Sequence, residues 1–136
     1  MPAIPWTSFI EIEPQRECLI LASRLPLRSY WQIPRFLRLT LAVRRQLAES
    51  EGLVGYSLLA QVTKKTFLTL SAWVDAEHLQ AFVRALPHAD VMLELRPHMG
   101  PTAFTTWTAP GDALPVSWRE ATARLMGTAA AQGAAP

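Results

Sequence analysis

FLTLSAWVDAEHLQAFVRALPHADVM, residues 67–92, carries two hydrophobic periodicities, one directly after the other. In its first part apolar side chains alternate with others, which is typical of a half-buried strand. In its second part they recur at every third or fourth position, as on one face of a helix. Asp75 stands between the two parts, and aspartate caps helix N-termini well. The segment therefore predicts a strand over residues 66–74, a helix over 76–86 and a shorter helix over 89–95.

The rest of the chain predicts three more strands and two more helices around this segment. We expect strands over residues 17–25, 55–62 and 102–108, and helices over 34–50 and 116–126. These elements follow the order strand, helix, strand, strand, helix, strand, with one helix added. This order is the split βαβ pattern. The expected fold class is therefore α+β, a ferredoxin-like βαββαβ fold with a four-stranded antiparallel sheet and helices on one face.

The length of 136 residues is typical of one domain, which we assign to residues 17–126. Residues 1–16 contain three prolines and are expected to form an irregular N-terminal arm, and residues 127–136 a flexible tail.

No apolar stretch approaches the ~18 residues of a membrane span. The N-terminus also lacks the charged and then apolar pattern of a secretory signal. We therefore expect a cytoplasmic protein without a membrane partner.

The charge pattern argues against a nucleic-acid partner. The formal net charge is +2, whereas a dedicated nucleic-acid binder normally carries a denser basic stripe.

The lone cysteine, Cys18, begins an apolar run and is expected to be a small core residue. Four arginines on the first helix are interpreted as a solvated face: Arg35, Arg38, Arg44 and Arg45. No catalytic triad, glycine-rich phosphate loop or carboxylate pair is apparent, which removes most hydrolase and kinase functions.

Alternation gives the third strand one apolar face and one mixed face. The apolar face comprises Leu68, Leu70, Ala72 and Val74, and is expected to pack on the helices. The mixed face comprises Phe67, Thr69, Ser71 and Trp73. It carries no charge, so we expect it to be covered, either in a homodimer contact or by a small-molecule pocket. Both explanations hold at once if the pocket lies between the sheet and the helices of the same chain, near the dimer interface.

Three segments resemble the dimeric α+β barrel superfamily, which includes antibiotic-biosynthesis monooxygenases and haem-degrading monooxygenases. They are GLVGYSLL, FLTLSAWVDAEHLQAFV and TTWTAPGDALPVSWREATARL. The resemblance covers roughly residues 17–126. It implies a homodimeric, monooxygenase-like protein that binds an apolar or aromatic small molecule in a pocket beside the sheet. The alternative is a non-catalytic module that binds a small molecule or a partner, because this fold hosts many activities.

The resemblance also implies roles for two residues. Trp73 matches a tryptophan that packs against the porphyrin in haem-degrading members, and His88 lies where those members place an iron-ligating histidine. Two departures count against haem degradation by that mechanism. His88 follows Trp73 by 15 positions, a longer gap than in those enzymes, and the chain lacks the asparagine that they use on the first strand. The expected cofactor is therefore none or haem, with His88 as metal ligand only if haem is bound.

The candidate catalytic residues are His88 and Trp73. Imidazole titrates near neutrality, so His88 can shuttle a proton. The candidate substrate-binding residues are Tyr56, Phe67, Thr69, Ser71, Met92, Arg24 and Trp107. Arg24, a charge within the first strand, either binds an anionic substrate group or reaches solvent. Tyr56 and Trp107 either offer pocket hydrogen-bond donors or simply pack in the core.

Overall fold

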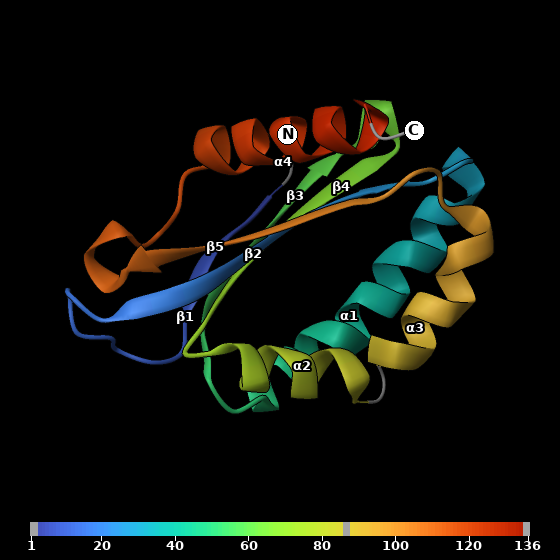
Figure 1. Cartoon of the computed structure of the whole chain (residues 1–136). Helices are drawn as coiled ribbons and strands as arrows, with labels where there is room; N and C mark the ends of the chain where they lie inside the picture. The colour runs from blue at the N-terminus through green and yellow to red at the C-terminus, as the bar shows by residue number, and fades with distance from the viewer. Residues whose placement is uncertain (1–2, 86–87, 135–136) are drawn as a thin grey trace.

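The computed structural model describes residues 3–85 and 88–134 (Figure 1). Its strands are β1 (Ala3–Ser8), β2 (Glu17–Pro26), β3 (Leu53–Gln61), β4 (Thr66–Trp73) and β5 (Ala103–Pro110). Its helices are α1 (Ile33–Glu49), α2 (Ala76–Arg84), α3 (His88–Leu95) and α4 (Trp118–Ala134). All strand pairs are antiparallel, and the predicted α+β, ferredoxin-like class is confirmed.

The sheet has five strands rather than the predicted four, in the order β1-β3-β4-β2-β5. The additional strand, β1, lies in the segment that was expected to be an irregular arm, and it pairs with β3. Its register shifts between Ile4 and Thr7, on either side of Pro5. Proline is tolerated on an edge strand because its missing N–H does not break an inner ladder. Pro5 therefore marks an edge strand rather than irregular chain.

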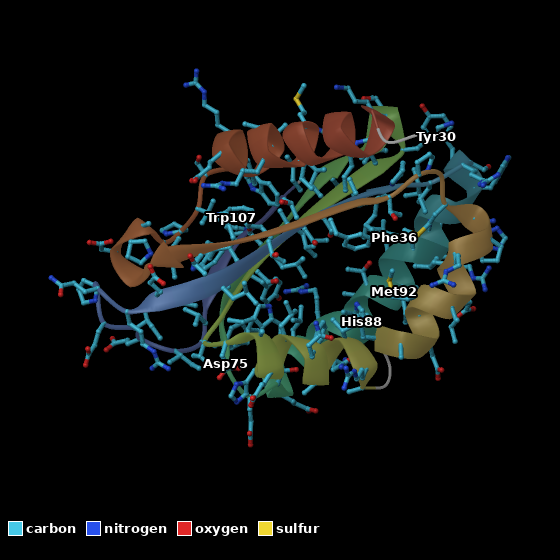
Figure 2. The ribbon with its side chains drawn as sticks, viewed as in Figure 1. Tyr30, Phe36, Asp75, His88, Met92 and Trp107 are labelled. Atoms are coloured by element: carbon cyan, nitrogen blue, oxygen red, sulfur yellow. The ribbon has the colours of Figure 1, made fainter. Side chains whose placement is uncertain are left out.

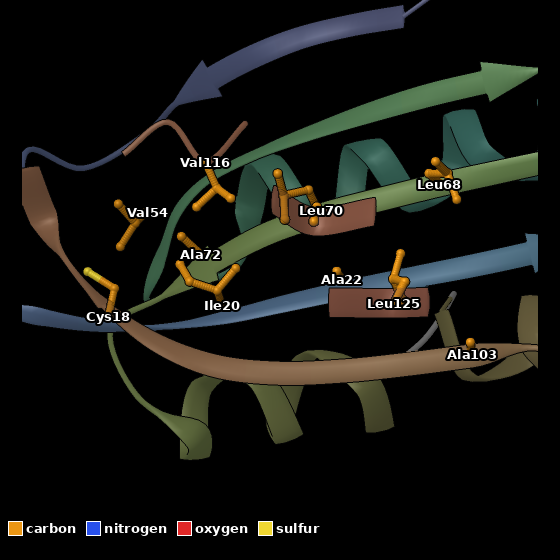
Figure 3. Packing of buried hydrophobic residues seen from close by; sticks show 11 residues of the cluster. Cys18, Ile20, Ala22, Val54, Leu68, Leu70, Ala72, Ala103, Val116 and Leu125 are labelled. Atoms are coloured by element: carbon orange, nitrogen blue, oxygen red, sulfur yellow. The ribbon is translucent and has the colours of Figure 1, made fainter. Parts of the chain in front are cut away.

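Helices cover both faces of the sheet, so the prediction of helices on one face is wrong. In Figure 1, α1, α2 and α3 lie on one side of the sheet and α4 lies on the other. Two buried side chains of α4, Ala121 and Leu125, belong to the same hydrophobic cluster as Ile20, Leu70 and Ala72 of the sheet (Figure 3). The apolar face thus packs on α4, and the mixed face meets α1–α3. Alternation separates the two faces but does not say which helices each one receives.

The C-terminal helix is longer than the sequence indicated. α4 continues to Ala134, over most of the segment expected to be a flexible tail. Alanine dominates this segment and is the best helix former, which explains the extension. Within residues 3–85 and 88–134, no helix is long and apolar enough to cross a membrane.

The junction after β4 follows the predicted capping chemistry. The Asp75 carboxylate accepts a hydrogen bond from the backbone N–H of His78, at 2.9 Å. This bond and the contact with the His78 ring lower the pKa of Asp75. α2 ends at Arg84, and Leu86, the expected last residue of this helix, lies outside the described residues.

A homodimer is expected from the sequence if one face of the sheet needs a second chain to cover it. Helices of the same chain cover both faces here, so this premise does not hold. The homodimer stays a prediction that rests on the family resemblance alone.

Docking of α4 predicts unequal effects of substitution at two neighbouring positions. Leu125 is 2% exposed and Met126 is 68% exposed. We expect Leu125→Ala to lower the free energy of unfolding by about 2–4 kcal/mol, because it leaves a cavity against the sheet. Met126→Ala is the matched control and should change it by no more than about 0.5 kcal/mol. Urea denaturation followed by circular dichroism measures both, and equally small effects would mean that α4 is not packed on the sheet.

Candidate functional site

A cavity of about 640 Å³ lies between the mixed face of the sheet and helices α1, α2 and α3. Most of its lining is aliphatic or aromatic, with a minority of polar side chains. The main polar lining residues are Ser23, Thr40, Arg44, Tyr56, Thr69, Ser71, His88 and Arg96. None of the described lining residues is acidic. Its size and composition are those of a small-molecule site.

The cavity exists because the helix-facing core is divided into two clusters. At one end Phe36 of α1 stacks on Phe67 of β4, with ring centroids 4.2 Å apart. At the other end Trp73 packs against Phe82 of α2 at 5.3 Å, and Leu47 joins them. Members of both clusters line the cavity. The large rings hold the helices off the sheet at its two ends, and the smaller residues between them do not fill the gap.

Arg44 lies in the cavity wall, which corrects its assignment to a solvated face. Its Nε donates a hydrogen bond to the Tyr56 hydroxyl at 3.0 Å. Tyr56 is 4% exposed, and its ring stacks on Phe9. Arg44 follows Phe36 by eight positions and precedes Leu47 by three, so it belongs to the inward-facing stripe of α1. That spacing was the signal in the sequence that could have identified it.

His88 begins α3 and lines the cavity (Figure 2). Its Nδ1 lies 3.2 Å from the carbonyl oxygen of Val83. A carbonyl only accepts, so we assign the ring proton to Nδ1, which leaves Nε2 as the basic nitrogen. Burial lowers the pKa of His88 from its ordinary value of 6.5, against a smaller opposite effect of the Val83 carbonyl. The imidazole is therefore neutral at pH 7 and able to accept a proton.

Gln46 of α1 bridges the last turn of α2 and the first residue of α3, and sequence reasoning missed it. Its side-chain carbonyl accepts a hydrogen bond from the backbone N–H of His88 at 2.8 Å. Its amide group donates to the carbonyl of Phe82 at 3.0 Å. Both bonds join segments far apart in the sequence, so no local pattern could reveal them. Gln46 thereby positions the backbone that carries His88.

Six of the predicted site residues line the cavity together: Tyr56, Phe67, Thr69, Ser71, His88 and Met92. They come from β3, β4 and α3. The Thr69 hydroxyl contacts the Ser23 hydroxyl of β2. The Ser71 hydroxyl accepts a hydrogen bond from the Trp73 indole N–H at 2.9 Å. Two of the polar groups in the floor of the cavity are thus already paired within the protein.

Three predicted site residues lie elsewhere: Trp73, Arg24 and Trp107. Trp73 is fully buried and packs beneath the lining rather than in it. Arg24 is exposed and pairs in register with Leu68, on the face that turns toward α4. Trp107 also lies on that face (Figure 2), opposite Ile20. The Arg124 guanidinium lies 4.4 Å from the ring centroid of Trp107. Arg24 and Trp107 thus belong to the other side of the sheet, whereas Trp73 lies on the cavity side but below its surface.

The lowered pKa of His88 predicts both its titration and a pH dependence of stability. An NMR titration of the ring should give a midpoint below 6.5, the ordinary value. Because the unfolded chain then binds the proton more readily than the folded one, stability should fall as the pH drops from about 6.5 through the folded pKa. His88→Gln should remove this part of the pH dependence in thermal melts. A midpoint above 6.5 would contradict the buried, neutral imidazole.

Similarity to known proteins identifies the fold of this chain but not its activity. No protein-family model and no curated protein matches the sequence. Among solved structures, SnoaB, a cofactor-independent oxygenase from Streptomyces nogalater, is 15% identical with a TM-score of 0.57, over 73% of this chain and 98% of SnoaB. An antibiotic biosynthesis monooxygenase is 13% identical, with a TM-score of 0.61 over 67% of this chain and 97% of its own.

A conserved protein from Methanosarcina mazei Go1 is also 13% identical, with a TM-score of 0.61 over 68% of this chain and 92% of its own. At these identities the likeness concerns the backbone only. The chain therefore has the ferredoxin-like α+β fold of antibiotic-biosynthesis-monooxygenase-like proteins, as the resemblance in its sequence predicts.

Proposed function

We propose that this protein is a monooxygenase-like enzyme that acts without a cofactor on an apolar or aromatic small molecule in the cavity. The observation that carries the proposal is a neutral, half-buried histidine in the wall of a mostly apolar cavity. Solved structures of the same fold include proteins described as oxygenases, which agrees with this reaction class. The fold by itself would not be sufficient support, because related folds host unrelated chemistry.

In the proposed reaction His88 acts as the general base. Its Nε2 accepts a proton from an activated CH₂ group of the substrate, and the electron pair stays on the substrate as a delocalised carbanion. This electron-rich carbanion is then oxidised by O₂. Overall the CH₂ group becomes a carbonyl, one oxygen atom enters the product and the other leaves as water. The apolar lining keeps bulk water away from the carbanion, which it would otherwise reprotonate.

Haem is the second candidate ligand for His88. A ligating histidine commonly donates its second ring N–H to a carbonyl or carboxylate, and the Nδ1 contact of His88 with the Val83 carbonyl has this form. Two arginines of the lining, Arg44 and Arg96, match the carboxylates of haem in charge. His88 would then hold the iron through Nε2, and the bound haem would supply the redox chemistry. A Soret band that appears on addition of haemin and is lost in His88→Ala would support this alternative.

Turnover of a fused-ring ketone with an acidic CH₂ group, such as anthrone, tests the proposal. Oxygen uptake and anthraquinone formation should exceed the buffer rate, and His88→Gln should lower the enzymatic rate on the order of 10²–10⁴-fold. His98→Gln is the matched control, since His98 contacts Arg35 and does not line the cavity. It should leave the rate unchanged.

Two results would count against this function. If the wild type binds anthrone but consumes no O₂ above the buffer rate, the chain is a non-catalytic binding module. If His88→Gln retains the full rate, His88 is not the base.

A further inference from the structure

We infer that the cavity selects an apolar molecule that carries one anionic oxygen group, and that Arg44 and Tyr56 bind that group. The inference rests on the proposed function in using the same cavity. It adds the charge of the ligand and the residues that recognise it, which the role of His88 does not decide.

The charge of the cavity wall favours an anion. Arg44 is half-buried, and it forms no ion pair with any carboxylate of the described residues. Arg35 and Arg124, by contrast, pair with Glu94 and Glu120 on the surface. Since no described lining residue is acidic and His88 is neutral, nothing in the cavity offsets the guanidinium charge. A ligand anion would offset it in a setting where the apolar surroundings strengthen the attraction.

Among the described lining residues, the hydrogen bonds leave donors free together at Arg44 and Tyr56; the other free guanidinium, that of Arg96, is exposed. The Ser71 hydroxyl is paired with Trp73, and the Thr40 hydroxyl donates to the Phe36 carbonyl at 2.8 Å. Tyr56 accepts from Arg44 Nε, so the hydrogen of its own hydroxyl is left to donate. The two terminal amino groups of Arg44 make no other hydrogen bond within residues 3–85 and 88–134.

This pair therefore presents several free donors, while its one acceptor, the Tyr56 oxygen, is already engaged by Arg44. An anionic oxygen group only accepts hydrogen bonds, so it can pair with all of these donors. An amide or an alcohol also carries donors of its own, and these would find no acceptor in the pair. The remaining lining provides contact for a hydrophobic body, from residues such as Leu58, Val91 and Met92. A carboxylate or an ionised enol on a hydrophobic skeleton has the required chemistry.

Two fluorescent dyes that differ by one anionic group test the inference directly. 1-Anilinonaphthalene-8-sulfonate carries a sulfonate, and N-phenyl-1-naphthylamine is the same skeleton without it. In fluorescence titrations the wild type should bind the sulfonate dye at least about 10-fold more tightly. Arg44→Gln should weaken binding of the sulfonate dye by roughly 10- to 100-fold, the usual effect of a hydrogen bond to a charged group, and leave the neutral dye unchanged.

Arg38→Gln is the matched control, because Arg38 is an exposed arginine of the same helix that does not line the cavity. It should change neither affinity. Tyr56→Phe removes one hydroxyl and should weaken binding of the sulfonate dye by a few-fold, without changing binding of the neutral dye. This variant replaces Arg44→Gln in the test if Arg44→Gln does not fold. Circular dichroism melts check the fold of each variant. Displacement of the dye by 2-naphthoate or by ionised 2,4-dinitro-1-naphthol then tells a carboxylate ligand from an enolate-like one.

The outcomes separate this inference from the proposed function. Equal affinities for the two dyes, unaffected by Arg44→Gln, would overturn the anion site and leave oxygen-dependent turnover at His88 untouched. Failure of the sulfonate dye to bind at all would also overturn it. Selective loss of the sulfonate dye in Arg44→Gln would support the anion site even if the chain turns over no substrate.

Discussion

Both faces of the central sheet have to be kept from water, and this one constraint organises the molecule. On the apolar face, the side chains of α4 join those of the strands in one continuous cluster. On the mixed face, α1, α2 and α3 rest on two separate clusters. Aromatic rings dominate both of these contacts, and rings set a wider spacing than aliphatic side chains do. Helix α4 packs directly on the first face, and the second one encloses the cavity beside His88.

The polar groups of the cavity divide into those that the protein satisfies and those that it leaves available. The floor hydroxyls of Ser71 and Thr69 are engaged with neighbouring side chains. The Arg44–Tyr56 pair keeps free donors, and His88 keeps a free basic nitrogen. A ligand in the cavity would pair with these free groups, which the protein itself leaves without partners. The proposed proton transfer and the proposed anion site use these two sets of free groups.

The fold and the chemistry rest on different parts of the chain. The backbone matches oxygenases at low sequence identity, and such a likeness carries the architecture without the activity. Residues particular to this chain determine what the cavity can do. Gln46 ties α1 to the start of α3 and so places His88 over the cavity, while Arg44, one half-turn earlier on α1, supplies the charge. Both residues act from the helix that the two clusters hold away from the sheet.

Local patterns in the sequence determined the element types, because they depend on neighbours a few positions apart. The alternation through β4, the Asp75 cap and the periodicity of α1 all predict their elements correctly. The same alternation placed Phe67, Thr69 and Ser71 in the covered face, and they line the cavity.

Only the tertiary structure decided which helices cover which face. The alternation of side chains along a strand distinguishes its two sides but does not say which helices pack on each side. Trp107 and Arg24 could therefore not be separated from the cavity residues by sequence alone. The side of the sheet on which α4 packs, the contact of Arg44 with Tyr56 and the clamp of Gln46 on His88 join segments distant in the sequence. Such contacts follow from three-dimensional packing, which no local pattern records.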